Sequence, residues 1–258
     1  MLIEYQTPIS KINFRAMHAL VSAFDLTLGY LERIAGIKII LRENLSMSKP
    51  LVMLGAGGHA TILAEMLLIE GRQIIAVVSP EVINDNSPLS NINRLTNNED
   101  LLTAYSIEQV ELVNGIGAMP GNDMHFRLFN YFSEQGYRFA SVVSPYAMVS
   151  KFAQLAEGVQ IMAGAIVQTN ASISMNSLIN SGAIIEHDCC IGPHNHIAPG
   201  ATLSGAVVTA SQVHVGTGAN VIQAIKIGEQ AVVGAGCTVV RDVPAKQVIV
   251  PARSRILR

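Results

Sequence analysis

The sequence predicts a two-part protein: an α/β domain of the βαβ (Rossmann-like) type, followed by an all-β left-handed parallel β-helix. Two observations predict this fold class. Aliphatic residues recur every six positions over 143–244, and before them strand-like and helix-like segments alternate. A chain of 258 residues can hold two modest cores. We expect an N-terminal extension of uncertain structure at 1–48, a βαβ domain at 49–142, a β-helix at 143–244 and a C-terminal tail at 245–258.

The first 48 residues are the least regular part of the chain. Residues 14–36 favour one or two amphipathic helices. Charges at Arg15, Asp25 and Glu32 interrupt this segment, unlike the apolar segment of a secretory signal. Met47 lies just before the first strand-like segment, so a natural start at Met47 is an alternative hypothesis.

Six segments of the next hundred residues alternate between strand and helix patterns. The predicted strands are LVMLG (51–55), IIAVV (74–78), VELVNGIG (110–117) and YRFASVV (137–143), and the predicted helices are HATILAEMLLIEG (59–71) and DMHFRLFNYFSEQG (123–136). Such alternation is typical of βαβ units around a small parallel sheet.

The first turn of this domain, GAGGHA, places glycines between a strand and a helix N-terminus. Backbone N–H groups and the helix dipole can receive an anion or a nucleotide-sugar there. The dinucleotide fingerprint fits Gly55, Gly57 and Ala60, but the second strand ends in Ser79 and Pro80, where a nicotinamide site expects an acid. A redox cofactor is therefore disfavoured. A turn that only lets helix and strand pack closely is the structural alternative.

The repeat consists of 17 consecutive hexads from Val143 to Pro244. Their first positions are aliphatic except at Thr209, and their fifth positions are mostly small or β-branched. This period is typical of a parallel β-helix in which three hexads make one triangular coil of 18 residues. We expect five to six left-handed coils, and a homotrimer with ligand sites in the grooves between protomers.

Composition excludes several classes of partner. A net charge of −2 gives no electrostatic case for nucleic acid or an anionic membrane surface. No apolar run approaches the roughly 20 residues of a membrane span, so the mean hydropathy of +0.37 reflects the β-helix core. Cys189 and Cys237 fall at small fifth positions and are interpreted as buried hydrophobes, while Cys190 lies beside them. The sequence contains no CxxC pair that would suggest a zinc site. Nothing in the cysteine pattern implies an oxidising compartment, so the cytoplasm is the default location.

Polar residues interrupt the repeat between Asn180 and His196, in the segment NSGAIIEHDCCIGPHNH. His187 falls on the outside of a corner with acids on either side, which is the usual arrangement of a general base. Gly205 follows one coil later, and its missing side chain leaves a backbone N–H open to a reacting carbonyl. His214 follows His196 by one coil, so we expect the two to stack beside a groove suited to pantetheine. His194 and His214 are interpreted as structural.

Four motifs together resemble the NeuD/PglD-type family of bacterial sugar acetyltransferases. They are GAGGHA, VNGIG at 113–117, GYRFASVVSPYA at 136–147 and INSGAIIEHDCCIGPHNHIAPGA, and the resemblance covers about three quarters of the chain. It implies a nucleotide-sugar-binding domain on a left-handed β-helix, a trimer, and acetyl transfer from acetyl-CoA without a metal. The acceptor is an amine of a nucleotide-linked amino-sugar in bacterial surface-glycan biosynthesis, or alternatively a hydroxyl of a sialic-acid-like sugar.

The resemblance also implies roles for individual residues. His187 matches the catalytic base, Asp188 the acid beside it, and Asn180 a polar residue of the catalytic site. The positions matching acetyl-CoA contacts are His196, Gly205, Thr217 and Ala235, and those matching nucleotide-sugar contacts are Gly57, Gly58, His59 and Gly117.

The sequence departs from the family pattern at two places. Ser79 and Pro80 replace the acids that often contact the nucleotide, so the nucleotide and the sugar stay open. The segment after VPA lacks the GNPA-like turn of many hexapeptide acyltransferases, which leaves the CoA adenine contacts open, and acyl groups larger than acetyl remain alternatives. Two rival readings are a γ-type carbonic anhydrase with three histidines on zinc, and a non-catalytic sugar-binding protein of the same fold.

Overall fold

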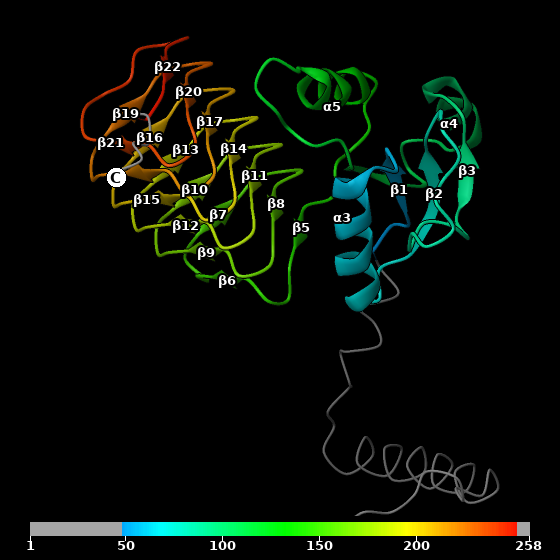
Figure 1. Ribbon diagram of the computed structural model, residues 1–258. Helices are drawn as coiled ribbons and strands as arrows, with labels where there is room; N and C mark the ends of the chain where they lie inside the picture. Colours follow the sequence, from blue (N-terminus) through cyan, green and yellow to red (C-terminus); the bar gives the residue numbers. More distant parts are fainter. Residues whose placement is uncertain (1–47, 252–258) are drawn as a thin grey trace, which may run out of the picture. The chain divides into compact units, whose positions relative to one another are not determined.

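The computed structural model describes residues 48–251 (Figure 1). The described residues belong almost entirely to one compact unit, which begins at Lys49. The helices expected within 14–36 and the alternative start at Met47 lie outside the described residues. None of the helices that are described is both long and apolar enough to cross a lipid bilayer.

The α/β part contains a four-stranded parallel sheet in the order β3-β2-β1-β4. Its elements are β1 Leu51–Leu54, α3 Gly58–Ile69, β2 Ile74–Val78, β3 Asn93–Leu95, α4 Asn98–Ala104, β4 Glu111–Asn114 and α5 Met124–Glu134. All four residues of β1 are buried because both faces of the sheet are covered. Alternate side chains of β1 pack against α3 on one face and against α4 and α5 on the other.

Two elements of this domain were absent from the sequence prediction. β3 is a three-residue edge strand without a buried residue, so it carries no apolar pattern. α4 is short, but the sequence contains a signal for its start. Asn97 is a preferred N-cap residue, and its side chain accepts the backbone N–H of Asp100. The expected strand at 137–143 was wrong for most of its length: Phe139 forms an isolated bridge to Leu112, and a regular strand begins only at Val142.

The repeat folds into a three-sided parallel β-helix with sheets of seven, six and five short strands. The seven-stranded face contains β5 Val142–Val143, β8 Gln160–Ile161, β11 Leu178–Ile179, β14 His196–Ile197, β17 His214–Val215, β20 Val232–Val233 and β22 Val248–Ile249. The six-stranded face contains β6 Met148–Val149, β9 Ile166–Val167, β12 Ile184–Ile185, β15 Thr202–Leu203, β18 Asn220–Val221 and β21 Thr238–Val239. The five-stranded face contains β7 Gln154–Leu155, β10 Ser172–Ile173, β13 Cys190–Ile191, β16 Val208–Thr209 and β19 Lys226–Ile227.

Successive coils pair in parallel at a spacing of 18 residues, as Ile184 with Thr202 illustrates. The chain turns three corners in each coil, which we name by the faces they join: the seven–six corner, the six–five corner and the five–seven corner. First- and fifth-position side chains form one continuous core along the axis. Cys189 and Cys237 are buried in it, which confirms that prediction.

Thr209, the polar residue at the first position of its hexad, is buried, and its hydroxyl is hydrogen-bonded. Its hydroxyl accepts hydrogen bonds from the backbone N–H of Gly192 and from the side-chain amide of Asn195. The oxygen of that amide accepts the backbone N–H of Val213. Thr209 and Asn195 thus satisfy each other inside an apolar core, where an unpaired polar group would be costly.

The six-residue spacing is broken before Pro244, where the sequence had placed its end. The β-helix itself continues beyond that residue. Val243 pairs with Ile227 at a spacing of 16 instead of 18, because the last corner is two residues shorter. The carboxylate of Asp242 accepts the backbone N–H of Lys226 there, in place of a main-chain carbonyl. β22 then pairs with β20, so the β-helix extends into the expected tail at 245–258.

The α/β domain and the first coils share a core. Met162 and Leu178 of the β-helix pack in the same cluster as Leu63 and Leu67 of α3. This apolar contact fixes the carboxyl ends of β1 and β4 relative to the seven-stranded face, which positions the site described next.

Candidate active site

His187 and Asp188 form a hydrogen-bonded pair on the six–five corner. The Nδ1 atom of His187 lies 2.8 Å from Oδ2 of Asp188, and both side chains are exposed. Asp188 adopts a left-handed backbone conformation with φ of 61°, which turns its carboxylate back toward the imidazole. Because a carboxylate can only accept, Nδ1 carries the proton and Nε2 keeps a free lone pair.

Two residues one coil away complete the surroundings of this pair. The side-chain amide of Asn170 donates to Oδ1 of Asp188 at 3.2 Å. The imidazole of His187 covers Gly205, where an added Cβ would lie 2.7 Å from Cε1 and 2.8 Å from Nε2. The coil spacing had predicted the position of Gly205. The same spacing could have revealed Asn170, which the sequence reasoning missed.

The pair has the electrostatics of an oriented base. Hydrogen bonds from His187 and Asn170 hold the pKa of Asp188 below its usual value, so its carboxylate stays ionised into the acidic range. An ionised partner on Nδ1 fixes the tautomer of His187 and stabilises the imidazolium that forms when Nε2 takes a proton.

The structure does not bring Asn180 to this pair within one chain. Asn180 lies at the seven–six corner, where its oxygen accepts the backbone N–H of Ser181 and its nitrogen lies 3.1 Å from Nε2 of His196. His196 belongs to β14 of the seven-stranded face, in register with His214 of β17, and the two rings meet edge to face with centroids 4.9 Å apart. The stacking of His196 and His214 expected from the coil spacing is confirmed.

Of the four residues expected to contact acetyl-CoA, His196 lies in β14 and the other three divide between two corners. Gly205 lies beneath His187 on the six–five corner. Thr217 and Ala235 follow each other on the seven–six corner, where the carbonyl of Thr217 accepts the backbone N–H of Gly236. The absence of a side chain at Gly216 allows close approach there, because an added Cβ would lie 2.6 Å from the nitrogen of Ala235.

The Gly-rich turn and the end of β4 meet at the carboxyl edge of the sheet. β2 and β4 flank β1 on opposite sides, so a topological switch point lies there. A Cβ at Gly57 or Gly58 would meet nothing within 4 Å, which leaves the N-terminus of α3 open to a ligand. Gly117 lies beside His59, with 3.8 Å between an added Cβ and that of His59. These four predicted substrate residues therefore come together.

His59 is held by a buried amide of the β-helix. Its Nε2 lies 2.7 Å from Oε1 of Gln160, and the nitrogen of the same amide donates to the carbonyl of Asn114. A carbonyl only accepts, so the orientation of Gln160 is fixed and Nε2 of His59 carries the proton. Burial lowers the pKa of His59, which favours the neutral ring.

The end of β2 differs from an acidic ribose site. The guanidinium of Arg94 donates to the carbonyls of Ser79 and Pro80, at 3.1 and 3.3 Å. This strand end therefore lacks the acid of a ribose site and carries instead the exposed cation of Arg94.

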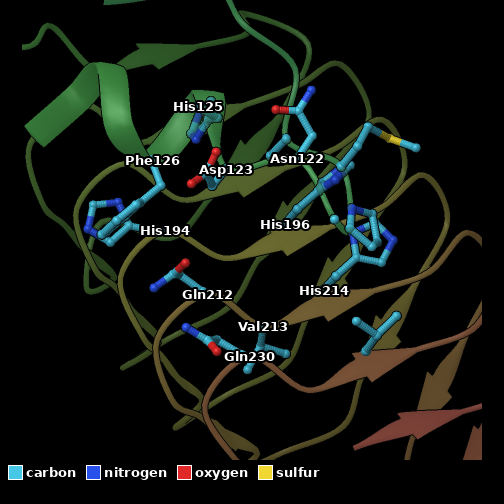
Figure 2. A pocket seen from close by; sticks show the side chains of 15 residues that line it. Asn122, Asp123, His125, Phe126, His194, His196, Gln212, Val213, His214 and Gln230 are labelled. Atoms are coloured by element: carbon cyan, nitrogen blue, oxygen red, sulfur yellow. The ribbon is translucent and has the colours of Figure 1, made fainter. Parts of the chain in front are cut away.

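A cavity of about 370 Å³ lies between the loop after β4 and the five–seven corner (Figure 2). It is lined by four histidines, His125, His194, His196 and His214, and by the amides of Gln212 and Gln230. Burial lowers the pKa of His125 to about 3 and those of His194 and His196 to about 4, so these rings are neutral at pH 7. Sequence reasoning missed His125 as a site residue, because its helix reaches the β-helix only through the tertiary fold. Over residues 48–251, no three His, Cys, Asp or Glu side chains group as metal ligands.

Comparisons with known proteins agree with this architecture. The family Bacterial transferase hexapeptide (six repeats) matches residues 170–205. PerB from Caulobacter crescentus, solved with CoA and GDP-perosamine, is 30% identical with a TM-score of 0.68, over 77% of this chain and 92% of PerB. The acetyltransferase domain of PglB from Neisseria gonorrhoeae is 26% identical with a TM-score of 0.69, over 78% and 96% of the two chains, and has been solved with acetyl coenzyme A. A search of curated proteins returned no match.

A β-helix of hexapeptide repeats with an outward His–Asp pair over a glycine defines an acyltransferase of the hexapeptide class. Within that class, the chain belongs to the sugar acetyltransferases of the left-handed β-helix type, together with PerB and the PglB domain. The resemblance inferred from the sequence motifs is confirmed.

Proposed function

We propose that this protein transfers an acetyl group from acetyl-CoA to the amine of a nucleotide-linked amino-sugar, for bacterial surface-glycan biosynthesis. The observation that carries the proposal is the exposed His187–Asp188 pair, in which Nε2 has a free lone pair and the ring lies against Gly205. The open helix N-terminus at Gly57 and Gly58 supports a nucleotide site in the same unit. PerB, with CoA and GDP-perosamine bound, supports this pair of substrates.

The proposed chemistry is direct transfer with His187 as general base. Nε2 of His187 takes a proton from the acceptor amine as the amine nitrogen attacks the thioester carbonyl. The C–S bond then breaks, and the CoA thiolate leaves and takes up a proton. The backbone N–H of Gly205 has no acceptor within the described part of the chain, so it is available to the oxyanion of the tetrahedral intermediate.

The chain offers little support for a covalent acyl-enzyme. Cys189 is two residues from His187, but its side chain is buried in the core. Burial raises the pKa of the Cys189 thiol to about 11, which suppresses the thiolate that an acyl-enzyme would require.

The proposed site is completed between protomers of a homotrimer. His187 and Gly205 lie on the six–five corner, whereas Asn180, Thr217 and Ala235 lie on the seven–six corner of the same chain. Residues on two corners of one prism face different directions. A neighbouring copy that docks its six–five corner against the seven–six corner would bring them together around the pantetheine of acetyl-CoA.

An acceptor screen tests the proposed activity. Purified protein is incubated with acetyl-CoA and a panel of nucleotide-linked amino-sugars that includes GDP-perosamine, and both free thiol and product mass are measured. We expect thiol release with one acceptor and a product heavier by one acetyl group. O-acetylation of a sialic-acid-like sugar would show that the acceptor is a hydroxyl and not an amine. Absence of transfer across the panel would favour the non-catalytic alternative.

Mixed assemblies test the shared site separately. His187→Ala and Asn180→Ala chains are purified, unfolded together at equal amounts and refolded. If each site takes His187 from one protomer and Asn180 from the next, about a quarter of the sites in a random mixture are intact and activity returns. Activity that stays at the level of the separate variants would contradict a site between protomers.

A further inference from the structure

The histidine-lined cavity contains buried ring nitrogens without partners. Nε2 of His125 and Nδ1 of His214 make no hydrogen bond to the described residues. His125 is 4% exposed, so solvent does not replace the missing partner at this nitrogen. Buried polar groups are normally paired, so each of these rings keeps one nitrogen without a partner in the described chain.

The orientation of one amide, Asn176, determines the polarity of two of these rings. Asn176 is fully buried, at a left-handed position with φ of 53° on the five–seven corner, one coil before His194. Its nitrogen lies 3.2 Å from Nδ1 of His125 and 3.0 Å from Nδ1 of His194. Its oxygen accepts the side-chain amide of Asn114 at 3.1 Å.

This orientation is fixed by a main-chain carbonyl. The side-chain nitrogen of Asn114 also donates to the carbonyl of His125 at 2.9 Å, and a carbonyl can only accept. Asn114 is therefore a donor toward Asn176, so the oxygen of Asn176 faces Asn114 and its nitrogen faces the two histidines.

The consequence is a fixed tautomer for each ring. Since Nδ1 of His125 and Nδ1 of His194 both accept from Asn176, the proton of each neutral ring is on Nε2. The rings are held in place as well, because Phe126 and Phe129 meet the His194 ring edge to face at 4.8 and 5.5 Å. Asn180 likewise fixes the tautomer of His196. Its side-chain nitrogen donates to Nε2, which leaves the proton of that ring on Nδ1.

The cavity thus presents N–H donors but no full positive charge. No lysine or arginine occurs among the described residues that line it, and Asp123 adds a carboxylate at its edge. A phosphate group would meet that carboxylate without a compensating cation. Neutral donors, the amides of Gln212 and Gln230, and apolar surface from Phe126 and Val213 suit an uncharged group rich in hydroxyls.

We propose that the cavity receives the hexose ring of the acceptor, and that Asn176 is the positioning residue that makes His194 a hydroxyl-recognising donor and holds the buried His125 beside it in the same tautomer. This inference rests on the proposed function for the identity of the ligand. The cavity begins at Ala118, directly after the glycines of the switch point, so a sugar attached to a nucleotide at that point enters it. His194 then sets specificity, and neither ring takes part in proton transfer.

Asn176→Asp is the sharpest test because it keeps the size of the side chain and replaces the donor by an acceptor. Asp also tolerates the left-handed conformation. With an oxygen in place of the nitrogen, Nδ1 of both rings must carry a proton. A ring that stays neutral then loses the proton from Nε2, which becomes an acceptor, whereas a ring that becomes an imidazolium keeps it. Nitrogen-15 NMR of histidine-labelled protein reports the tautomers directly. Asn176→Gly, which suits the same backbone conformation, removes the constraint and is expected to give mixed tautomers.

The functional readout is binding without acetyl-CoA, measured by calorimetry for GDP-perosamine and for GDP alone. In the wild type we expect the sugar to tighten binding, and in Asn176→Asp we expect this increment to fall by about tenfold while GDP binding is unchanged. Asn84→Asp is the matched control, since Asn84 lies in an exposed turn and its side-chain oxygen already acts as an acceptor.

Three outcomes would overturn the inference. Wild-type rings protonated on Nδ1 would refute the role of Asn176. Reversed tautomers in Asn176→Asp with an unchanged sugar increment would exclude the hexose from the cavity, and so would an absent increment in the wild type. Failure of the proposed function is a separate result: the sugar increment is present, but no thiol is released when acetyl-CoA is added.

Discussion

His187 and His125 are the same residue type in opposite surroundings. The side chain of His187 is 64% exposed and its Nδ1 faces an ionised carboxylate, whereas His125 is 4% exposed and its Nδ1 faces the amide of Asn176. A carboxylate partner stabilises the imidazolium, while an amide donor together with burial stabilises the neutral ring. The partner on Nδ1 therefore separates a ring suited to take up a proton from a ring that stays neutral.

The largest expected effect comes from His187→Ala. Loss of a general base lowers kcat by about 10²–10⁴-fold, and because the residue is exposed, trimer formation and CoA binding are expected to persist. Thiol release measured with saturating substrates gives kcat, and gel filtration checks the assembly. Unchanged turnover would remove His187 from the mechanism and erase the contrast with His125.

Gly205→Ala tests the position of the same ring without changing it. The new Cβ would lie 2.7 Å from Cε1 of His187, so the imidazole must move away. A displacement of about 1 Å costs on the order of 10²-fold in kcat. Ser204→Ala, a change of similar size at the neighbouring residue, is the control and is expected to retain activity. Equal rates for the two variants would show that the ring does not act from above Gly205.

The buried histidines are expected to make stability depend on pH. The pKa of His125 is about 3 in the folded protein, below the 6.5 of an unperturbed ring, so the unfolded state binds its proton first. The stabilisation is fully present above about pH 6.5 and is lost as pH falls toward 3, with a slope of about 1.4 kcal/mol per pH unit for each such ring. Urea denaturation between pH 7 and 4.5 measures this slope. In His125→Gln the slope of unfolding free energy against pH is expected to fall by the contribution of one ring. An unchanged slope would contradict the claim that burial lowers the pKa of His125.

The smallest effect is expected from Asn170→Gly, which removes the amide that donates to Asp188. Gly suits the left-handed backbone of Asn170, where φ is 62°, so the corner is retained. Loss of one hydrogen bond to a carboxylate that keeps its histidine partner costs about 1 kcal/mol, or roughly fivefold in kcat. Lys246→Gly, at another left-handed position with φ of 61°, controls for the added backbone freedom. A loss as large as that of His187→Ala would mean that Asn170 has a further role.

Much of the candidate site could be predicted because the repeat converts sequence distance into spatial distance. Eighteen residues mean one coil, which placed Gly205 under His187 and His214 over His196. The same arithmetic would have given Asn170 beside Asp188. The spacing of Asn180 and His187 also implies two successive corners, a separation that the family resemblance obscured.

Other parts could not be predicted because they depend on contacts without a period. His125 meets Asn176 across 51 positions of the chain, from a helix of one domain to a corner of the other. The contraction at Val243 was equally hidden, since the shortened corner depends on Asp242 taking the place of a main-chain carbonyl. The edge strand β3 has no buried residue and therefore leaves no hydrophobic pattern.

The sequence by itself determined the β-helix, its core and the column in which each polar residue lies, because hydrophobic periodicity decides which side chains face inward. Only the tertiary structure decided which histidines are exposed beside a carboxylate and which are buried against an amide. The physical reason is that protonation and tautomer follow from burial and from the hydrogen-bond partner on each ring nitrogen. For His125 that partner comes from a distant segment that the fold brings alongside.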